Sequence, residues 1–336
     1  MDDEASALRV HAAHDALFRT VFSRPEQAEA LGRSILPAPL AARLEAGSVR
    51  VLAGAHVDEA LRGTTSDVVL SVRTAGHAAR VVLLLEHQSR SEPRMALRLF
   101  RYVGEVWARE ARGPLPDVIP IVVHAGRRPW AASIEITGLM ARTDDAALAS
   151  LRPRFTYLVD DLTVLSPAAL LARALPPLGT LALWALSIAP RRRVGETAQQ
   201  VASLFGELLR TDGGADAVRV ILRYLASVLP RQDRGVLETA IVALPHDVKE
   251  LAVKTIADEW REEGEARGEA RGEARGEARG EVRGRAAIVG KLLRLRFGPL
   301  PEGVEARLAA ASIEALDRLA ERVLVADSLD TALADD

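Results

Sequence analysis

The chain lacks cysteine, and aromatic residues make up only 4% of its 336 residues. Without cysteine there can be no disulfide, no thiolate metal site and no cysteine nucleophile. The longest apolar run, near Leu178–Ala189, is too short to span a bilayer and has proline beside it. The first residues, MDDEASALRV, are acidic and lack the apolar stretch of a signal peptide. We therefore expect a cytoplasmic protein with no membrane partner.

Neither sign of charge dominates the chain. Lys and Arg number 44 against 46 Asp and Glu, which gives a formal net charge of −2. Nucleic-acid-binding proteins usually have a basic bias, so the overall charge does not favour one, although a local groove can still be basic. The length suits about two domains at roughly 100–200 residues each.

The segment Ser66–Ser89 has the pattern of two strands joined by a turn that contains glycine. Its first run, Ser66–Arg73, is rich in valine and leucine, and its second, Ala79–Glu86, is apolar with charge only at its ends. This pattern predicts an antiparallel β-hairpin. Asp67 begins the first strand and Glu86 ends the second, so the two carboxylates are expected near one edge of the sheet.

Side chains alternate between the faces of a strand, so Glu86 and Gln88 share one face and His87 takes the other. The pattern therefore predicts a cluster of Asp67, Glu86 and Gln88. An acid at the end of so apolar a strand is costly unless a partner binds it. One such partner is Mg²⁺, which is commonly held by one or two carboxylates, water and phosphate oxygens. The alternative is that Glu86 leaves the core at the strand end and pairs with an arginine.

The order of elements predicts an α/β fold with a mixed sheet. Two helices come first, followed by a strand at Val49–Val57 and then the hairpin. A long helix over Glu92–Arg112 precedes strands at Asp117–His124 and Phe155–Leu162. The first helices are expected over His14–Phe22 and Pro25–Leu36, with a short one at Pro39–Glu45.

After Ser166 the patterns become helical. Helices are expected at Pro167–Ala189, Gly195–Arg210, Ala215–Leu229, Gly235–Leu244 and Asp247–Arg261. The four-residue repeat Gly264–Gly284 follows, and it suits a marginal helix or an extended spacer because each Gly costs a helix about 1 kcal/mol relative to Ala. The tail, Arg285–Leu333, has two or three helices and looks too small for much core of its own, so we expect it to pair with itself or with another subunit. The predicted divisions are 11–165, 166–262, 263–284 and 285–336.

Three segments carry a family resemblance: HDALFRTVFSRPE, LRGTTSDVVLSV and VLLLEHQSRSEPRMALRLFRYVGEVW. They resemble the YhgA-like putative transposase family, whose members are also called Rpn recombination-promoting nucleases and belong to the PD-(D/E)XK superfamily. The likeness covers roughly residues 11–260, and EHQS followed by MALRLFRY is its most specific part. The repeat followed by LLRLRFGPLP resembles the small C-terminal domain often attached to these proteins.

The resemblance implies a metal-dependent DNA endonuclease with a restriction-endonuclease-like αβββαβ core, acting in recombination or mobile-element turnover. Asp67 matches the first acid of the family motif and Glu86 the second. Gln88 stands where many superfamily members have lysine, and it is a known variant within the family. An amide can orient water but carries no charge, so the cofactor, Mg²⁺ or another divalent cation such as Mn²⁺ or Ca²⁺, would have to acidify the water.

Three acids outside the motif and His87 have competing interpretations. Asp15 is interpreted as an acid at the start of the first helix, where it would face the helix dipole; alternatively, the family's leading helix brings it near the metal. Asp160 and Asp161 are interpreted as solvated turn acids, although one could sit beside the cluster. His87 is expected to face away from the metal and to pack under the long helix.

Arg94, Arg98 and Arg101 follow the motif at helical spacing. They form either a solvated face or a set of phosphate contacts, and the second case would make DNA binding salt-dependent. Tyr102 and Trp107, on the same predicted helix, are expected in the core.

Two other functions remain open. One is a catalytically inactive DNA- or protein-binding module that assembles through its C-terminal tail, as a homodimer or higher oligomer formed by the repeat and the last helices. The other is a transposase that performs strand transfer, but no three-acid constellation of that kind is evident.

Overall fold

The computed structural model describes residues 2–52, 68–75, 81–110, 113–188, 194–229, 235, 238, 241–242 and 244–334. The chain divides into an N-terminal unit, Met1–Glu259, and a C-terminal unit, Trp260–Asp336. None of the helices in the described ranges is both long and apolar enough to cross a membrane. The finer four-part division of the chain stays a prediction.

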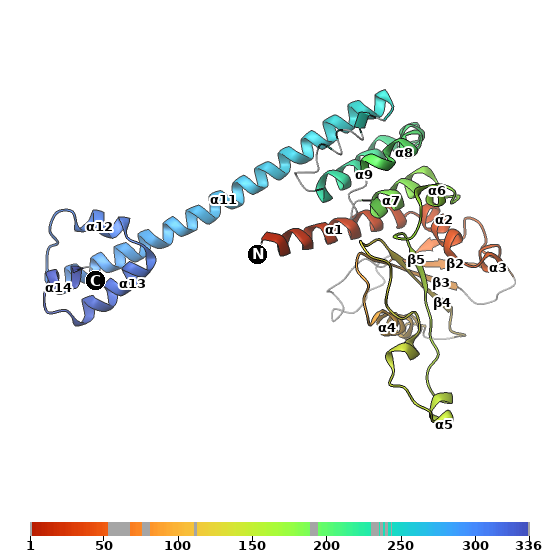
Figure 1. Ribbon diagram of the computed structural model, residues 1–336, viewed down its shortest axis with the longest axis horizontal. Helices are drawn as coiled ribbons and strands as arrows, with labels where there is room; N and C mark the ends of the chain where they lie inside the picture. The colour runs from red at the N-terminus through yellow and green to blue at the C-terminus, as the bar shows by residue number, and fades with distance from the viewer. Residues whose placement is uncertain are drawn as a thin grey trace. The chain divides into compact units, whose positions relative to one another are not determined.

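A five-stranded mixed sheet lies at the centre of the N-terminal unit (Figure 1). Its order is β1-β2-β3-β4-β5, with β1–β2 and β2–β3 antiparallel and β3–β4 and β4–β5 parallel. The strands are β1 (Arg50–Val51), β2 (Val68–Val72), β3 (Val81–Gln88), β4 (Asp117–His124) and β5 (Leu158–Asp161). The predicted hairpin and the mixed α/β class are confirmed. The end of the strand predicted at Val49–Val57 lies outside the described residues.

Helices cover both faces of this sheet. The helices in this part of the chain are α1 (Asp2–Phe22), α2 (Pro25–Ile35), α3 (Ala38–Ala41), α4 (Met95–Ala108), the 3₁₀ helix η2 (Ile136–Leu139) and α5 (Ala146–Ser150), of which α5 lies away from the sheet (Figure 1). Helix α4 places Leu99 and Tyr102 in a buried cluster with Val69 and Val122, so it packs on the face to which these strand residues belong. Helix α1 lies on the opposite side of the sheet in Figure 1.

Helix α4 is shorter than predicted and buries one aromatic fewer. It begins at Met95, after Pro93, and ends at Ala108. Tyr102 is buried as expected, but Trp107 is 36% exposed. Its indole N–H donates to the main-chain oxygen of Pro116 at 3.0 Å, which holds the ring next to the start of β4. The prediction of a core Trp107 was therefore wrong.

The second half of the N-terminal unit is helical, as expected. Its helices include α6 (Pro167–Leu171), α7 (Pro177–Ile188), α8 (Val194–Leu209) and α9 (Gly214–Val228). The single helix predicted over Pro167–Ala189 is in fact two, because proline at 176 and 177 cannot donate the backbone hydrogen bonds of a continuous helix. Helix α7 is apolar all round and contacts α1, α2, α6, α8 and α9. Most of the predicted helix Gly235–Leu244 lies outside the described residues.

One helix, α11 (His246–Phe297), runs for 52 residues through the Gly-Glu-Ala-Arg repeat. It joins three segments that the sequence treats separately, namely Asp247–Arg261, the repeat and the first tail helix. Of the two predicted states of the repeat, the helix is the one observed. The Gly residues of the repeat have no heavy atom within 4 Å of where a Cβ would lie, so no close packing against this chain explains their presence.

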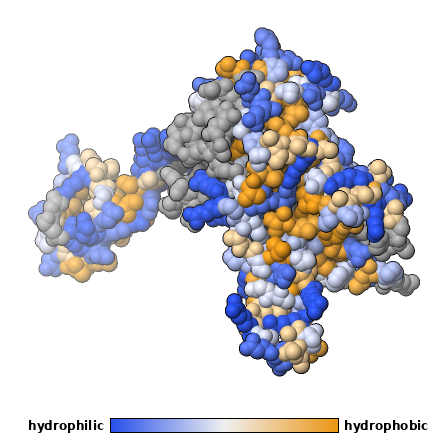
Figure 2. Space-filling model, turned by 45° about the vertical axis from the view of Figure 1, so that its right-hand side comes forward, coloured by the Kyte–Doolittle hydropathy of each residue, from blue (hydrophilic) through white to orange (hydrophobic). Residues whose placement is uncertain are grey.

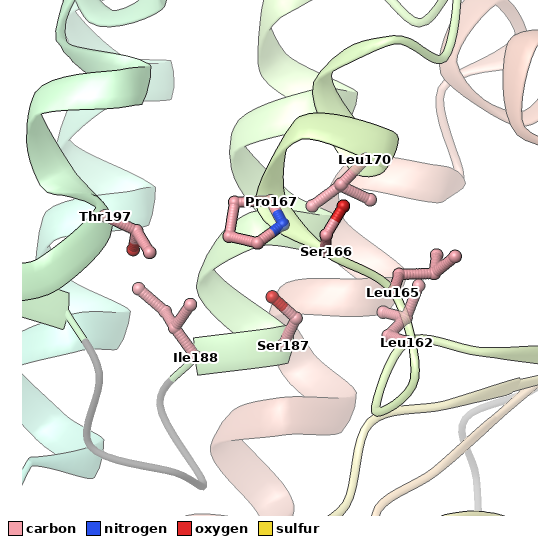
Figure 3. Close-up of a pocket in the computed structure, with 8 residues that line it drawn as sticks. All are labelled: Leu162, Leu165, Ser166, Pro167, Leu170, Ser187, Ile188 and Thr197. Atoms are coloured by element: carbon pink, nitrogen blue, oxygen red, sulfur yellow. The ribbon is translucent and has the colours of Figure 1, made fainter.

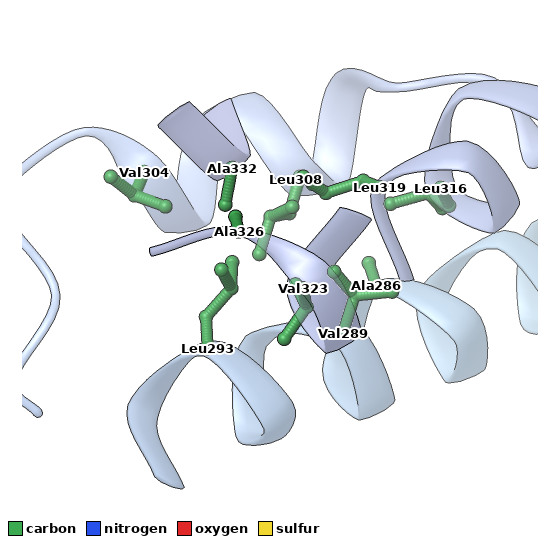
Figure 4. Close-up of a cluster of buried hydrophobic side chains, with 10 residues drawn as sticks. All are labelled: Ala286, Val289, Leu293, Val304, Leu308, Leu316, Leu319, Val323, Ala326 and Ala332. Carbon is green, nitrogen blue, oxygen red and sulfur yellow. The ribbon is translucent and has the colours of Figure 1, made fainter. Parts of the chain in front are cut away.

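The C-terminal unit has a core of its own, contrary to the expectation from its size. Helices α12 (Val304–Ala310), α13 (Ile313–Val325) and α14 (Leu329–Leu333) pack on the end of α11 around ten buried residues (Figure 4). Ser312 caps α13 as predicted, since its hydroxyl accepts the N–H of Ala315 at 3.2 Å. Figure 2 shows apolar and hydrophilic residues side by side on the surface of this unit.

Candidate functional site

The hairpin brings together the chain positions next to the two predicted metal ligands. Val68, which follows Asp67, pairs with Leu85, which precedes Glu86. Asp67 and the side chain of Glu86 lie outside what the structure describes. The antiparallel pairing thus reaches the neighbours of both acids, while the meeting of the two carboxylates stays a prediction.

The carboxyl ends of the three parallel strands form one polar edge of the sheet. Gln88 pairs with His124 across β3 and β4, and His124 pairs with Asp161 across β4 and β5. Gln88 is 9% exposed and His124 only 1%. Parallel strands end at the same edge, so Gln88 lies beside His124, which the sequence analysis did not place there, and Asp161 follows one strand further on.

His124 links the end of β3 to the loop that follows β4. Its Nδ1 lies 2.9 Å from the main-chain oxygen of Gln88, and its Nε2 lies 2.8 Å from that of Arg128. A neutral imidazole carries a single N–H, so either neutral tautomer donates to one of these oxygens. The buried ring therefore connects the main chain at the end of β3 to the main chain of the loop after β4, with one ring nitrogen at each contact.

Asp161 anchors the same loop; it is a half-buried acid at the end of β5, where the turn begins. One carboxylate oxygen accepts the N–H of Trp130 at 2.7 Å, and the other accepts the N–H of Thr163 at 2.9 Å. The residue belongs to β5, and both of its oxygens are engaged by main-chain donors. Its role here is to hold the connections on either side of the sheet edge.

Asp160 is buried and ion-paired, so its interpretation as a solvated acid was wrong. The two guanidinium nitrogens Nη1 and Nη2 of Arg173 donate to its two oxygens at 2.7 and 2.5 Å. The side chain of Asp160 is 6% exposed and that of Arg173 is 15% exposed. Such a bidentate pair satisfies both carboxylate oxygens at once, so Asp160 is committed to Arg173.

His87 packs under α1, whereas the sequence analysis expected the long helix α4. The ring is fully buried, lies 5.4 Å from the Phe18 ring between centroids, and places Nδ1 3.0 Å from a carboxylate oxygen of Asp15. Burial lowers the pKa of His87 most strongly, while the hydrogen bond to Asp15 raises it. His87, which stands between Glu86 and Gln88, is thus held in place by contacts with α1.

Asp15 lies within α1 and not at its start, because the helix begins at Asp2. Its interpretation as an acid at the helix start was therefore wrong. Its second oxygen lies 3.5 Å from Nε2 of His11, and Nδ1 of His11 lies 3.0 Å from the hydroxyl of Ser89. Successive turns of α1 therefore contact β3 and the residue after it, which positions the end of the strand.

A second buried histidine joins α1 to the helical half of the unit. Nδ1 of His14 lies 2.6 Å from the Tyr224 hydroxyl of α9. Burial, with a smaller contribution from nearby His87, lowers the pKa of His14 to about 3. Burial also raises the pKa of the Tyr224 phenol well above its ordinary value. Both groups are therefore neutral around pH 7, and neutral partners suit a hydrogen bond in this dry region.

The three arginines after the motif differ in their surroundings. Arg94 and Arg101 are exposed, whereas Arg98 is half-buried on Tyr102. Nε of Arg98 donates to the Tyr102 hydroxyl at 3.1 Å, and its guanidinium carbon lies 5.6 Å from the ring centroid. A role of these side chains in phosphate contact stays a prediction.

The described residues contain no group of three or more His, Asp or Glu that could hold a metal ion. A small cavity of about 40 Å³ lies between the segment leading into α6 and helices α7 and α8 (Figure 3). It is lined mainly by apolar side chains such as Leu162, Leu170 and Ile188, with Thr197 at one side. Its volume suits about one water molecule, and the polar edge of the sheet does not line it.

Some of these polar residues carried a signal that the sequence analysis did not use. His124 ends an apolar strand, DVIPIVVH, just as Glu86 and Gln88 end RVVLLLEHQ. A polar residue that closes a buried strand, taken together with parallel pairing, would have pointed to the row Gln88, His124 and Asp161. The contacts of Asp15 with His87 and of Asp160 with Arg173 had no such signal, because each joins segments distant in the chain.

Comparison with known proteins identifies the family. Residues 12–214 match the family described as putative transposase, YhgA-like. The chain is 36% identical over 124 residues to recombination-promoting nuclease RpnD of Escherichia coli O157:H7, covering 35% of this chain and 48% of that protein. It is 30% identical over 155 residues to the inactive recombination-promoting nuclease-like protein RpnE of Escherichia coli K12, covering 45% and 51%.

A shorter relative is covered more completely. The putative inactive recombination-promoting nuclease-like protein YjiP of Escherichia coli K12 is 37% identical over 89 residues, which are 26% of this chain and 86% of that protein. The chain spans about half the length of RpnD and RpnE. No solved structure matches. The family match covers more than half of the chain and agrees with the resemblance noted in its motifs. The chain belongs to the YhgA-like putative transposase family.

Proposed function

We propose that this chain is a metal-dependent DNA endonuclease that hydrolyses phosphodiester bonds in recombination or mobile-element turnover. The observation that carries the proposal is the β2–β3 pairing. It runs to the neighbours of Asp67 and Glu86, and β3 ends in the polar edge of the sheet. The order of helices, three strands, helix and further strands is compatible with a PD-(D/E)XK core.

The predicted donor set fits a hard divalent cation. Asp67 and Glu86 would supply carboxylate oxygens, which Mg²⁺, Mn²⁺ and Ca²⁺ accept as ligands. A bound cation of this kind supplies an acidified water and neutralises charge that develops on the phosphate. Gln88, the next residue but one after Glu86, would orient the attacking water through its amide. His87, held by Asp15, would keep this end of β3 in place.

The relatives support nuclease chemistry and also an alternative. RpnD is named a recombination-promoting nuclease, whereas RpnE and YjiP are named inactive. DNA is the proposed substrate because recombination acts on DNA. The alternative is an inactive DNA- or protein-binding module that assembles through its C-terminal unit, and Gln88 in place of lysine is the residue that favours it.

The site can be tested by plasmid cleavage with Mg²⁺, Mn²⁺ or Ca²⁺, and with a chelator as a blank. The variants are Asp67→Ala, Glu86→Ala and Gln88→Ala, beside Asp144→Ala, which removes an exposed acid of the same unit. We expect the first two to abolish cleavage, since each removes a ligand, and Asp144→Ala to cleave as the wild type does. Gln88→Lys should keep or raise the rate if the side chain orients water.

Two results would count against this assignment. Cleavage that survives both Asp67→Ala and Glu86→Ala would exclude them as the metal ligands. A wild-type protein that binds DNA but cleaves with none of the three metals would favour the binding module. Circular dichroism of each variant checks that the loss is not one of folding.

A further inference from the structure

Two loops meet at the polar edge of the sheet. The first, Ser89–Arg94, follows β3, and the second, Ala125–Trp130, follows β4. They are side by side because β3 and β4 are parallel and end in register at Gln88 and His124. The two loops therefore border the chain position to which the proposed water-orienting amide belongs.

The second loop is tied to the sheet at its beginning and its middle. The N–H of Ala125 donates to the main-chain oxygen of Gln88 at 2.9 Å. The main-chain oxygen of Arg128 contacts the buried His124 ring at 2.8 Å. Because this contact uses the backbone of Arg128, it leaves the guanidinium available for another role.

The loop is also tied down at its end, and it passes close to the first loop. Asp161 accepts the N–H of Trp130, and the Ser91 hydroxyl accepts the N–H groups of Ala131 and Ala132 at 3.0 Å each. A Cβ at Gly126 would lie 2.7 Å from the main-chain oxygen of Ser89. Only glycine allows so close an approach, so the two loops have a defined relative position.

The charge presented by this pair of loops is opposite in sign to that of the chain. Arg90, Arg94, Arg127 and Arg128 are all exposed, and Glu92 is the only acid in the two segments. The chain as a whole carries a formal net charge of −2. The two segments beside this edge therefore contain four arginines and one acid.

We infer that Arg127 and Arg128, on the rigid loop after β4, bind backbone phosphates of DNA next to the site of cleavage. The inference rests on the proposed function and names the residues that position its substrate. Arginine presents a planar set of donors that matches phosphate oxygens in a bidentate way. A loop anchored at both ends and in the middle holds the backbone of these residues in place, so that binding does not have to order the loop itself.

The test measures binding separately from cleavage. Fluorescence anisotropy follows a labelled DNA duplex with a chelator present, over a series of salt concentrations. The variants are Arg127→Ala/Arg128→Ala and the charge-preserving Arg127→Lys/Arg128→Lys. The matched control is Arg142→Ala/Arg154→Ala, which removes two exposed arginines of the same unit. A labelled RNA duplex of the same sequence forms a second arm.

The alanine pair should weaken DNA binding at least tenfold at low salt. It should also make the slope of the logarithm of the DNA association constant against the logarithm of the salt concentration shallower by about 2. Each lost phosphate contact removes about 0.9 from this slope. The lysine pair should restore most of the slope, because lysine keeps the charge. The control pair should bind as the wild type does.

The inference is overturned by an unchanged slope in the alanine pair, by an equal loss in the control pair, by wild-type protein that does not bind the DNA duplex, or by an effect confined to RNA. Failure of this inference can be told apart from failure of the proposed function, because binding and cleavage are measured separately. DNA binding that depends on Arg127 and Arg128 without any cleavage would support the loop and reject the nuclease. Cleavage by the wild type, together with a salt slope that does not change in the alanine pair, would support the nuclease and reject the role of the loop.

Discussion

The two units of this chain bury different kinds of side chain. Within the described ranges, the buried polar and charged residues, His87, His124 and Asp160 among them, belong to the N-terminal unit. The core of the C-terminal unit consists of alanine, valine and leucine. Burying a polar group is unfavourable unless it is hydrogen-bonded. Desolvation of polar side chains therefore lowers the stability of the N-terminal unit more than that of the C-terminal unit.

Several of these buried polar residues lie at the carboxyl ends of the parallel strands. His87, His124 and Asp160 all lie within the last two positions of β3, β4 or β5. Their partners come from α1, from the loop after β4 and from the segment after α6. The C-terminal unit is therefore stabilised by apolar packing. The N-terminal unit gives up part of its folding free energy to desolvate polar groups that hold the carboxyl ends of its strands in place.

The largest effect is expected from breaking the buried ion pair. Arg173→Ala should lower the free energy of unfolding of the N-terminal unit by about 3–5 kcal/mol, because it leaves the Asp160 carboxylate buried without a partner. Chemical denaturation measures the change. The exposed pair Asp216–Arg219 provides the control, and Arg219→Ala should cost less than about 1 kcal/mol.

A double variant sharpens this prediction. Asp160→Asn with Arg173→Met removes both charges and should recover much of the loss, since the cost comes from an unpaired charge and not from lost attraction alone. Equal losses for Arg173→Ala and Arg219→Ala would show that burial does not distinguish the two pairs.

In the C-terminal unit, the comparable effect comes from a cavity. Leu293 is fully buried, and Leu293→Ala should destabilise this unit by about 2–5 kcal/mol. Leu295, two residues along the same helix, is 74% exposed, and Leu295→Ala should stay within about 0.5 kcal/mol. Hydrogen exchange of the amides in α12 and α13 reports on this unit separately. A large effect at Leu295 would instead indicate that a partner covers it.

The buried histidines predict a pH dependence confined to the N-terminal unit. The pKa of His14 falls from 6.5 to about 3 on folding, so below pH 6.5 the unfolded chain binds a proton that the folded one does not. The free energy of unfolding should therefore fall as the pH drops, by about 2 kcal/mol between pH 6.5 and 5. His87, whose pKa is also lowered, contributes in the same direction.

Denaturation curves at several pH values measure this dependence. His14→Gln should reduce the fall in the free energy of unfolding below pH 6.5. His246→Gln, which alters a side chain that is 88% exposed, should leave it as it is. A wild-type stability that does not fall below pH 6.5 would contradict the assignment of neutral, buried histidines.

The smallest effects are expected from single glycines, and they should have opposite signs in the two units. Gly272→Ala should stabilise α11 by about 0.5–1 kcal/mol, because alanine loses less backbone freedom in a helix and meets no atom there. Gly126→Ala should destabilise the N-terminal unit, because its Cβ would meet the oxygen of Ser89 at 2.7 Å. Hydrogen exchange in α11 and thermal melting measure the two changes. A destabilising Gly272→Ala would point to a second copy packed against the repeat.

Much of the fold followed from local patterns. The hairpin, β4 and the cap of α13 at Ser312 were predicted because alternation, apolar runs and capping residues act over short stretches of chain. The break between α6 and α7 was also visible in the prolines at 176 and 177, but the apolar content around it was given too much weight. The C-terminal core was missed because its residues come from the end of α11 and from the tail helices that follow it, and none of these segments shows by itself that they pack together.

The predicted site divides in the same way. Glu86 and Gln88 could be singled out because they end an apolar strand, and Asp67 because it begins the strand expected to pair with it. That the first helix covers His87 could not be predicted, since Asp15 and His87 are 72 residues apart. The pairing of Asp160 with Arg173 likewise depends on where the chain after α6 returns to the sheet.

The strand pattern of the hairpin, the helical periodicities and the family resemblance can all be recognised in the sequence, because they are properties of contiguous residues. Three features depend on tertiary contacts instead: Gln88, His124 and Asp161 form one row, α1 packs on the end of β3, and the loop that carries Arg127 and Arg128 lies beside that row. The physical reason is that parallel pairing and buried polar contacts join segments far apart in the chain, and local preferences do not encode which of those segments meet.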